Sequence, residues 1–254
     1  MPQARNRQKW LAWVGPKPRG LPAFAALVAA TGSCSTMVGP SAELHTASVQ
    51  IPIPDAANSL PAMLDQAAPP ALVGTSALEA NAALPLTTGF NPAASSLAFA
   101  PGSPVAQMRA LDCLAQAIYY EARSEREEGQ RAVAQVVLNR VRHPAWPNTV
   151  CGVVYQGALR LGGGCQFTFT CDGSLRFRPY GEDWARARRL ASEALAGRVF
   201  EPVGLSTFYH ANYVMPRWAP RLLKTAVIGA HLFYRLPGSG GLPAAFSARY
   251  EGFE

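Results

Sequence analysis

Apolar residues recur every three or four positions in two stretches near the middle of the chain. The first stretch starts near Gln107, and its apolar positions are Met108, Leu111, Leu114, Ala115 and Ile118. The second ends before Pro144, and its apolar positions are Val133, Val136, Val137 and Val141. This spacing matches the turn of an α-helix, whose interior does not tolerate proline. The pattern therefore predicts two consecutive helices that each bury one face.

A capping box marks the expected start of the second helix. Ser124 is followed three positions later by Glu127, so each side chain can hydrogen-bond to the backbone amide of the other residue. We therefore expect the second helix to begin at Ser124. Glu121 then lies at the junction of the two helices.

The following part of the chain predicts a loop, a helix and short strands. Gly162, Gly163 and Gly164 form a glycine-rich loop, and Asp183 is placed to cap a helix that runs to Gly197. Residues 205–210, 225–228 and 231–234 have the β-branched and aromatic content of strands, with Gly229 between the last two. The expected fold class is α+β, mainly helical, with a short β-hairpin.

The first 34 residues have the composition of an export signal. Residues 1–20 carry five Lys and Arg and no acid, and an apolar run over 21–30 precedes small residues. This run of about ten residues is half of the roughly twenty that a membrane-spanning helix needs, so we expect no transmembrane span. A lipid anchor on Cys34, after Thr31, Gly32 and Ser33, is an alternative to a cleaved signal. A buried N-terminal helix is the other alternative.

Residues 35–104 are rich in Ala, Pro and Ser, which predicts a disordered tether. The predicted catalytic domain covers residues 105–236. Residues 237–254 show no clear pattern and are expected to be a flexible tail.

The net charge of +7 is unevenly distributed. Residues 21–108 contain four acids and no Lys or Arg, whereas residues 109–236 contain seventeen Lys and Arg against ten Asp and Glu. A basic surface suits nucleic acid, lipid headgroups or anionic wall polymers. The arginines are scattered and no nucleic-acid-binding motif is present, so we expect no nucleic-acid partner.

Four cysteines fall within the predicted domain: Cys113, Cys151, Cys165 and Cys171. An even set in an exported domain predicts two disulfides, for which three pairings exist. A metal site is the alternative, but the spacings include no C-x-x-C pair. We expect neither a metal nor another cofactor.

Six blocks of residues 109–236 resemble, in order, the motifs of the SleB-type cell-wall hydrolase family. They are DCLAQAIYYEARSE, EGQRAVAQVVLNRV, VCGVVYQ, CQFTFTCDG, FYHANYVMPRWA and IGAHLFYR. The resemblance implies a fold like the helical core of lysozymes and lytic transglycosylases. It also implies that Glu121, in the YEAR block, is catalytic and that the substrate is peptidoglycan.

The surroundings expected for Glu121 suit a general acid. On a helix its face is shared with Ala117 and Ile118, and such apolar neighbours favour the protonated carboxyl. A protonated carboxyl can donate to the glycosidic oxygen next to N-acetylmuramic acid. If the carboxylate then deprotonates the C6 hydroxyl of this sugar, the product is a 1,6-anhydro sugar, whereas water gives a reducing end. The first route, that of a lytic transglycosylase, needs no second carboxylate, and we favour it.

Glu125 is the candidate second carboxylate, although an acid in the first turn of a helix also stabilises the helix dipole. Glu127 and Glu128 are better explained as a helix cap and as part of the solvent-exposed face of the same helix. Asp172 is better explained as a turn residue. Amides, hydroxyls and aromatic faces suited to sugars are candidates for substrate binding. These residues are Gln166, Phe167, Thr168, Tyr209, His210 and Trp218. His210 could also be a base or a packed residue, and His231 is better explained as structural.

Three other functions compete with this interpretation. A zinc-dependent amidase would need several metal ligands, but no H-E-x-x-H motif occurs and the histidines stand in unrelated contexts. A non-catalytic wall-binding protein would not need Glu121, and a nucleic-acid binder rests on charge alone. The favoured prediction is a peptidoglycan-cleaving enzyme exported to the periplasm or cell envelope.

Overall fold

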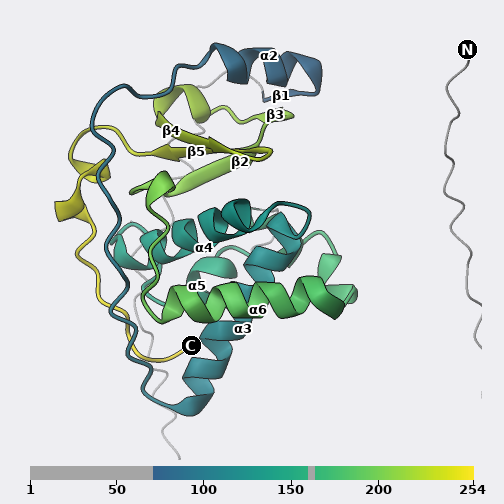
Figure 1. Cartoon of the computed structure of the whole chain (residues 1–254), viewed down its shortest axis with the longest axis vertical. Coiled ribbons are helices and arrows are strands. Elements are labelled where there is room, and N and C mark those ends of the chain that lie inside the picture. Colours follow the sequence, from purple (N-terminus) through teal and green to yellow (C-terminus); the bar gives the residue numbers. More distant parts are fainter. Residues whose placement is uncertain (1–70, 160–163) are drawn as a thin grey trace, which may run out of the picture. The chain divides into compact units, whose positions relative to one another are not determined.

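The computed structural model of the protein describes residues 71–159 and 164–254 (Figure 1). The predicted export signal, Cys34, the linker up to residue 70 and the first two glycines of the glycine-rich loop lie outside the described residues. Within the described part, no helix combines the length and the apolar character needed to cross a membrane.

Helix α3 (Pro104–Ala122) is the first of the two predicted helices. It begins after Ser103, whose side chain accepts a hydrogen bond from the backbone amide of Ala106 at 3.1 Å. Proline in the first turn suits a helix start because it has no amide hydrogen to leave unpaired. Leu114 and Ile118 are fully buried, as the sequence pattern predicted.

Helix α4 (Glu127–Arg142) is the second predicted helix, but it begins at Glu127 and the capping-box prediction is wrong. The residue before it, Arg126, makes no side-chain cap. Because α3 continues to Ala122, the chain needs a turn before α4, and the amide of Glu125 donates to the carbonyl of Ala122 at 2.9 Å. Glu127 instead pairs with Arg131 at 3.4 Å and with Arg189.

Two further helices complete the helical layer, α5 (Val150–Val154) and α6 (Gly181–Leu195). The predicted cap of α6 is also wrong, because Tyr180 precedes the helix and Asp183 lies in its first turn, paired with Arg186 at 2.6 Å. The main core lies among α3, α4, α5 and α6 and reaches the sheet through Phe208 and Tyr234. Figure 1 shows these helices on one side of the small sheet.

The sheet has the strand order β2–β5–β4 and is antiparallel throughout. Its strands are β2 (Phe208–Ala211), β4 (Leu223–Ile228) and β5 (His231–Arg235). Gly229, with φ of 59°, forms the turn of the β4–β5 hairpin. A separate pair joins β1 (Leu72–Val73) to β3 (Val214–Met215). The described residues thus confirm a mainly helical α+β fold with a short hairpin.

Short 3-10 helices lie between and after these elements in the described part of the chain. They are Thr168–Thr170, Ser174–Arg176, Glu201–Val203, Ala219–Arg221, Gly238–Gly241 and Pro243–Ala245.

The structure differs from the predicted tether between residues 71 and 104. This part contains β1 and the helix α2 (Thr75–Ala83), and its Ala77 and Leu97 are buried. The Ala-rich composition did not reveal this helix, which packs against β1 and β3. The folded part therefore begins well before residue 105.

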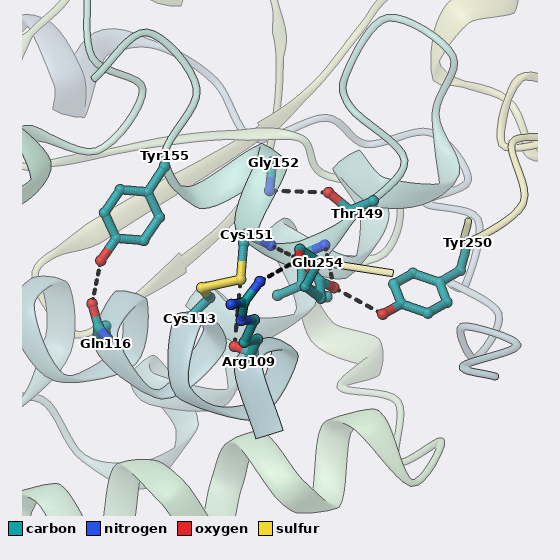
Figure 2. Close-up of a disulfide and its surroundings, with 10 residues drawn as sticks. Arg109, Cys113, Gln116, Thr149, Cys151, Gly152, Tyr155, Tyr250 and Glu254 are labelled. Atoms are coloured by element: carbon teal, nitrogen blue, oxygen red, sulfur yellow. Dashed lines mark hydrogen bonds between the residues drawn. A yellow bond between two sulfur atoms is a disulfide. The ribbon is translucent and has the colours of Figure 1, made fainter. Parts of the chain in front are cut away.

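The predicted flexible tail is also packed against the domain. Phe246 is buried, and the amide of Ala248 donates to the carbonyl of Arg142 at 2.9 Å. The carboxylate of Glu254 accepts from the amides of Val150 and Cys151 at 3.0 and 2.7 Å. Figure 2 shows Glu254 beside Cys151. Unpaired amides at the start of α5 attract an anionic side chain, a local match that periodicity does not reveal.

The four cysteines form two disulfides, which confirms the prediction and selects one of the three pairings. Cys113 of α3 bonds to Cys151 of α5, and Cys165 bonds to Cys171 (Figure 2 shows the first bond). The first spans 38 residues and joins two helices of the core, while the second spans 6 residues beside the cleft described below.

We expect the long-range disulfide to contribute more stability than the short one. Loop-closure entropy gives about 4 kcal/mol for a loop of this length and about 2 kcal/mol for the short loop. The double variant Cys113→Ala/Cys151→Ala should therefore lower the free energy of unfolding more than Cys165→Ala/Cys171→Ala, as measured by urea denaturation. Equal losses would contradict the loop-closure argument, and a peptide map of the oxidised protein with crossed pairs would contradict the pairing.

Candidate active site

A cleft of about 380 Å³ lies between the helical layer and the sheet. Its lining comes from α3, α4, the loop around the short disulfide, and strands β2, β3 and β5. The lining residues are Tyr120, Glu121, Arg140, Gln166, Thr168, Phe169, Asp172, Ser174, Tyr209, His210, Ala211, Tyr213, Val214 and His231.

Glu121 lies in the last turn of α3 and faces this cleft. The hydroxyl of Tyr209, on β2, donates to its Oε2 at 3.1 Å. Burial raises the pKa of the Glu121 carboxyl, and the negative charge of Asp172 acts in the same direction. The Tyr209 hydrogen bond and the positive charge of Arg140 oppose this rise, but burial is the larger effect.

Tyr209 is suited to remain a hydrogen-bond donor. Burial and the neighbouring Glu121 raise the pKa of its phenol well above the ordinary value. The hydroxyl therefore keeps its proton over the physiological range.

Arg140, on α4, places a buried cation beside this pair. Its Nε donates to the carbonyl of Thr207 at 2.7 Å, and its guanidinium lies 5.4 Å from the ring centroid of Phe167 and 6.0 Å from that of Phe208. Burial lowers the pKa of Arg140 to about 10, which still leaves it charged at neutral pH. In the described part of the chain, its Nη1 is buried without a hydrogen-bond partner.

The disulfide loop supplies polar and aromatic groups to the cleft. Gln166 and Thr168, two of the residues predicted to bind substrate, line it, whereas Phe167 is buried behind it between Arg140 and Tyr209. Phe169 stacks on Tyr120 with ring centroids 4.7 Å apart and so forms a flat aromatic wall.

His210 lines the cleft, but both of its ring nitrogens have protein partners. Nε2 lies 2.9 Å from the hydroxyl of Tyr234, and Nδ1 lies 3.0 Å from the carbonyl of Ala211. Burial lowers the pKa of this imidazole, which favours its neutral form. Trp218 packs against His210, Tyr234 and Phe208 and is not among the lining residues.

Glu125, the candidate second carboxylate, faces the β4–β5 hairpin and does not line the cleft. Its Oε1 accepts from the amide of Ala230 at 3.0 Å and lies 3.8 Å from Nδ1 of His231. The carboxylate fills the space beside Gly229, where a Cβ would lie 1.8 Å from its Oε2. Glu125 therefore holds the hairpin turn, a contact between distant segments that sequence spacing cannot show.

Asp172 is the other carboxylate that lines the cleft among the described residues. Its Oδ1 accepts from the amide of Ser174 at 2.8 Å, which is the turn contact that the sequence predicted. Hydrogen bonds with Ser174 lower the pKa of this exposed carboxyl, so it is ionised at neutral pH.

Metal ligands are not grouped anywhere in residues 71–159 and 164–254. No three His, Cys, Asp or Glu side chains there are placed so that they could hold one ion.

Arg140 and Tyr120 are cleft residues that the sequence analysis missed. The signal for Arg140 was available, because it lies four positions after Val136 and three after Val137 and so falls on the apolar face of α4. A charged residue on a buried helix face needs an interior partner, which can mark a functional site.

Comparisons with known proteins match the part of the chain that carries the sequence motifs. A family model described as Cell Wall Hydrolase matches residues 124–234. A spore cortex-lytic enzyme of Halalkalibacterium halodurans is 34% identical over 124 residues, which are 48% of this chain and 34% of that enzyme. The corresponding enzyme of Bacillus subtilis is 33% identical over 121 residues, or 47% of this chain and 35% of that one. The chain thus spans about a third of the length of each of these two enzymes.

A solved structure of the catalytic domain of the germination-specific lytic transglycosylase SleB from Bacillus anthracis is 30% identical. The match covers 50% of this chain and 93% of that domain, with a TM-score of 0.41. The catalytic domain of SleB from Bacillus cereus is 27% identical, with 56% of this chain and 100% of that domain covered and a TM-score of 0.43.

The family model matches the region that forms most of the cleft, and the two spore cortex-lytic enzymes and the Bacillus anthracis domain are 30 to 34% identical to this chain over the matched residues, so the chain belongs to the SleB-type cell wall hydrolase family.

Proposed function

We propose that this protein cleaves the glycan strand of peptidoglycan next to N-acetylmuramic acid, as a lytic transglycosylase with Glu121 as general acid and base. The observation that carries the proposal is the half-buried Glu121 carboxyl. It faces a cleft and accepts a hydrogen bond from the Tyr209 hydroxyl at 3.1 Å. The names of the matched relatives, spore cortex-lytic enzymes, support a cell-wall substrate.

In the first step Glu121 acts as an acid. Burial favours its protonated form, so the carboxyl can donate to the glycosidic oxygen as the bond to C1 of the muramic acid breaks. The leaving sugar takes this proton, and positive charge develops at C1.

In the second step the Glu121 carboxylate acts as a base. It takes the proton from the C6 hydroxyl of the same muramic acid while O6 bonds to C1, which gives a 1,6-anhydro sugar and restores the protonated acid. Arg140 and the Tyr209 hydroxyl stabilise the transient carboxylate, because both favour the ionised form.

The positions of the other carboxylates favour this route over hydrolysis. Glycosidases that use water employ a second carboxylate as base or nucleophile. Glu125 is engaged by the hairpin amide of Ala230, and Asp172 is engaged by Ser174 at the exposed rim. An intramolecular hydroxyl as the nucleophile needs only Glu121.

The remaining lining groups suit recognition of an N-acetylated sugar strand. Gln166 and Thr168 can hydrogen-bond to acetamido and hydroxyl groups, and the Tyr120–Phe169 wall offers a flat apolar face. His210 adds a polar side chain to the lining. Phe167 and Trp218 do not line the cleft but pack against Arg140 and His210 and so hold these two residues in place.

The rival functions have less support. A zinc amidase needs a ligand set that the described residues do not group, and a non-catalytic wall-binding protein would not need a carboxyl with a raised pKa in its cleft. The basic, acid-free N-terminus and the apolar run that follows it support export to the cell envelope, either with a cleaved signal or with a lipid anchor on Cys34.

The substitution Glu121→Gln should reduce the rate of muropeptide release from purified peptidoglycan by about 10²- to 10⁴-fold, since this is the usual contribution of a general acid–base group. The amide keeps the size of the side chain and can still accept the Tyr209 hydrogen bond. The thermal unfolding midpoint should therefore stay close to that of the wild type.

Asp172→Asn is the matched control, because it removes the other lining carboxylate and keeps an acceptor for the Ser174 amide. Its activity should stay close to that of the wild type. A loss as large as that of Glu121→Gln would show that a second carboxylate takes part and would favour hydrolysis by water.

The pH dependence should report the Tyr209–Glu121 hydrogen bond. Because the acid must be protonated, kcat/KM falls as pH rises through the pKa of Glu121. Tyr209→Phe removes a hydrogen bond that lowers this pKa, so the pKa rises further and the basic limb of the profile moves to higher pH. The other titratable lining groups, Tyr120, Arg140, Asp172, His210 and His231, are unchanged in this variant.

Tyr155→Phe is the control for this measurement, because Tyr155 bonds to Gln116 and does not line the cleft. Its basic limb should coincide with that of the wild type. A Tyr209→Phe profile whose basic limb is unmoved or lower would argue against Glu121 as the titrating acid.

A further inference from the structure

One wall of the cleft depends on a segment outside the range of the family match. This wall is formed by residues 211–215, of which Ala211, Tyr213 and Val214 line the cleft. Within the described residues, β3 (Val214–Met215) pairs with β1 and with no other strand. The amide of Gly74, which follows β1, donates to the carbonyl of Tyr213 at 2.9 Å.

Asn81 of α2 makes the most specific contact with this wall. Its Nδ2 donates to the carbonyl of Asn212 at 2.8 Å and to the carbonyl of Val214 at 3.0 Å. These carbonyls flank Tyr213, so a single amide group fixes the backbone on both sides of a cleft-lining residue. The side chain is 2% exposed, which excludes water as a ready replacement for the amide.

Lys224 of β4 holds the same segment in place. Its Nζ donates to the carbonyls of Asn81 and Leu84, both at 2.8 Å, and its own carbonyl accepts from the amide of Thr87 at 2.8 Å. A cation at the end of α2 satisfies carbonyl groups that the helix leaves unpaired. The segment is thereby fixed to the sheet whose strand β5 contributes His231 to the cleft.

We propose that residues 71–88 are a positioning segment for the substrate-binding wall at 211–215, with Asn81 as its positioning residue. The segment precedes residues 124–234, so this wall support lies outside the family-matched region. It determines how firmly the cleft holds a glycan strand, while Glu121 on α3 carries out the chemistry. This inference deepens the proposed function and rests on it.

The test compares Asn81→Ala with Glu79→Ala, an exposed position on the same helix. Loss of two hydrogen bonds at the wall should raise KM for soluble glycan fragments of peptidoglycan about tenfold, with kcat nearly unchanged. Backbone amides of residues 211–215 should exchange hydrogen faster in Asn81→Ala than in the wild type. Glu79→Ala should match the wild type in both measurements.

Hydrogen exchange needs no substrate, so it separates this inference from the proposed function. Unchanged exchange at residues 211–215 would overturn the positioning role even if the enzyme is active. Faster exchange with an unchanged KM would overturn the role in substrate binding. A wild-type protein that releases no muropeptides would defeat the proposed function instead.

Asn81→Asp is a second variant at this position, for use where Asn81→Ala does not fold. It keeps the shape of the side chain but replaces the donor group that faces the carbonyls of Asn212 and Val214 with an acceptor oxygen. It should show the same rise in KM and the same faster exchange, and wild-type behaviour of this variant would contradict the proposal.

Discussion

The hydrogen bond between Tyr209 and Glu121 joins the two layers of the fold at the point where the chemistry is proposed. Glu121 ends a helix of the core, and Tyr209 belongs to the central antiparallel sheet. The two side chains can meet only because the core fixes the helices relative to the sheet. Phe208 and Tyr234 pack into this core from the sheet side. Arg140 supplies a buried positive charge beside the pair. Burial therefore favours the protonated form of Glu121, whereas Tyr209 and Arg140 favour its ionised form.

This balance suits a residue that must give a proton and then accept one. A carboxyl raised in pKa by burial alone would be a good acid, but its anion would have no stabilising partner in the cleft. A carboxyl paired closely with a cation would be ionised before the reaction began. Burial is the larger effect on the pKa of Glu121, and the Tyr209 hydroxyl and the Arg140 guanidinium partly offset it, which places Glu121 between these extremes.

Patterns that depend on local spacing predicted much of the fold. The two apolar stripes predicted α3 and α4, and the strand-rich stretches around Gly229 predicted the β4–β5 hairpin. The even cysteine set predicted two disulfides but not their pairing. The YEAR motif drew attention to Glu121, which the structure places in the cleft.

The sequence could not reveal contacts between distant segments. Ser124 and Glu127 have the spacing of a capping box, but the turn that ends α3 takes up those positions. Glu125 lies four residues from Glu121, yet a hairpin more than a hundred residues later binds its carboxylate. The Ala-rich segment before α3 resembles a tether until Asn81 and Lys224 are seen to fix it to the sheet. In each case the deciding partner lies far away in the sequence.

The proposed mechanism requires Glu121 both to give and to take a proton, with no water molecule as the nucleophile. Mass spectrometry of peptidoglycan digested by the full chain, with its disulfides intact, tests it most directly. We expect muropeptides that end in a 1,6-anhydro sugar, one water lighter than reducing-end products, and their absence when Glu121→Gln is used. Reducing-end products would mean that water is the nucleophile, and free peptides that persist with Glu121→Gln would contradict the assignment of the glutamate and favour an amidase.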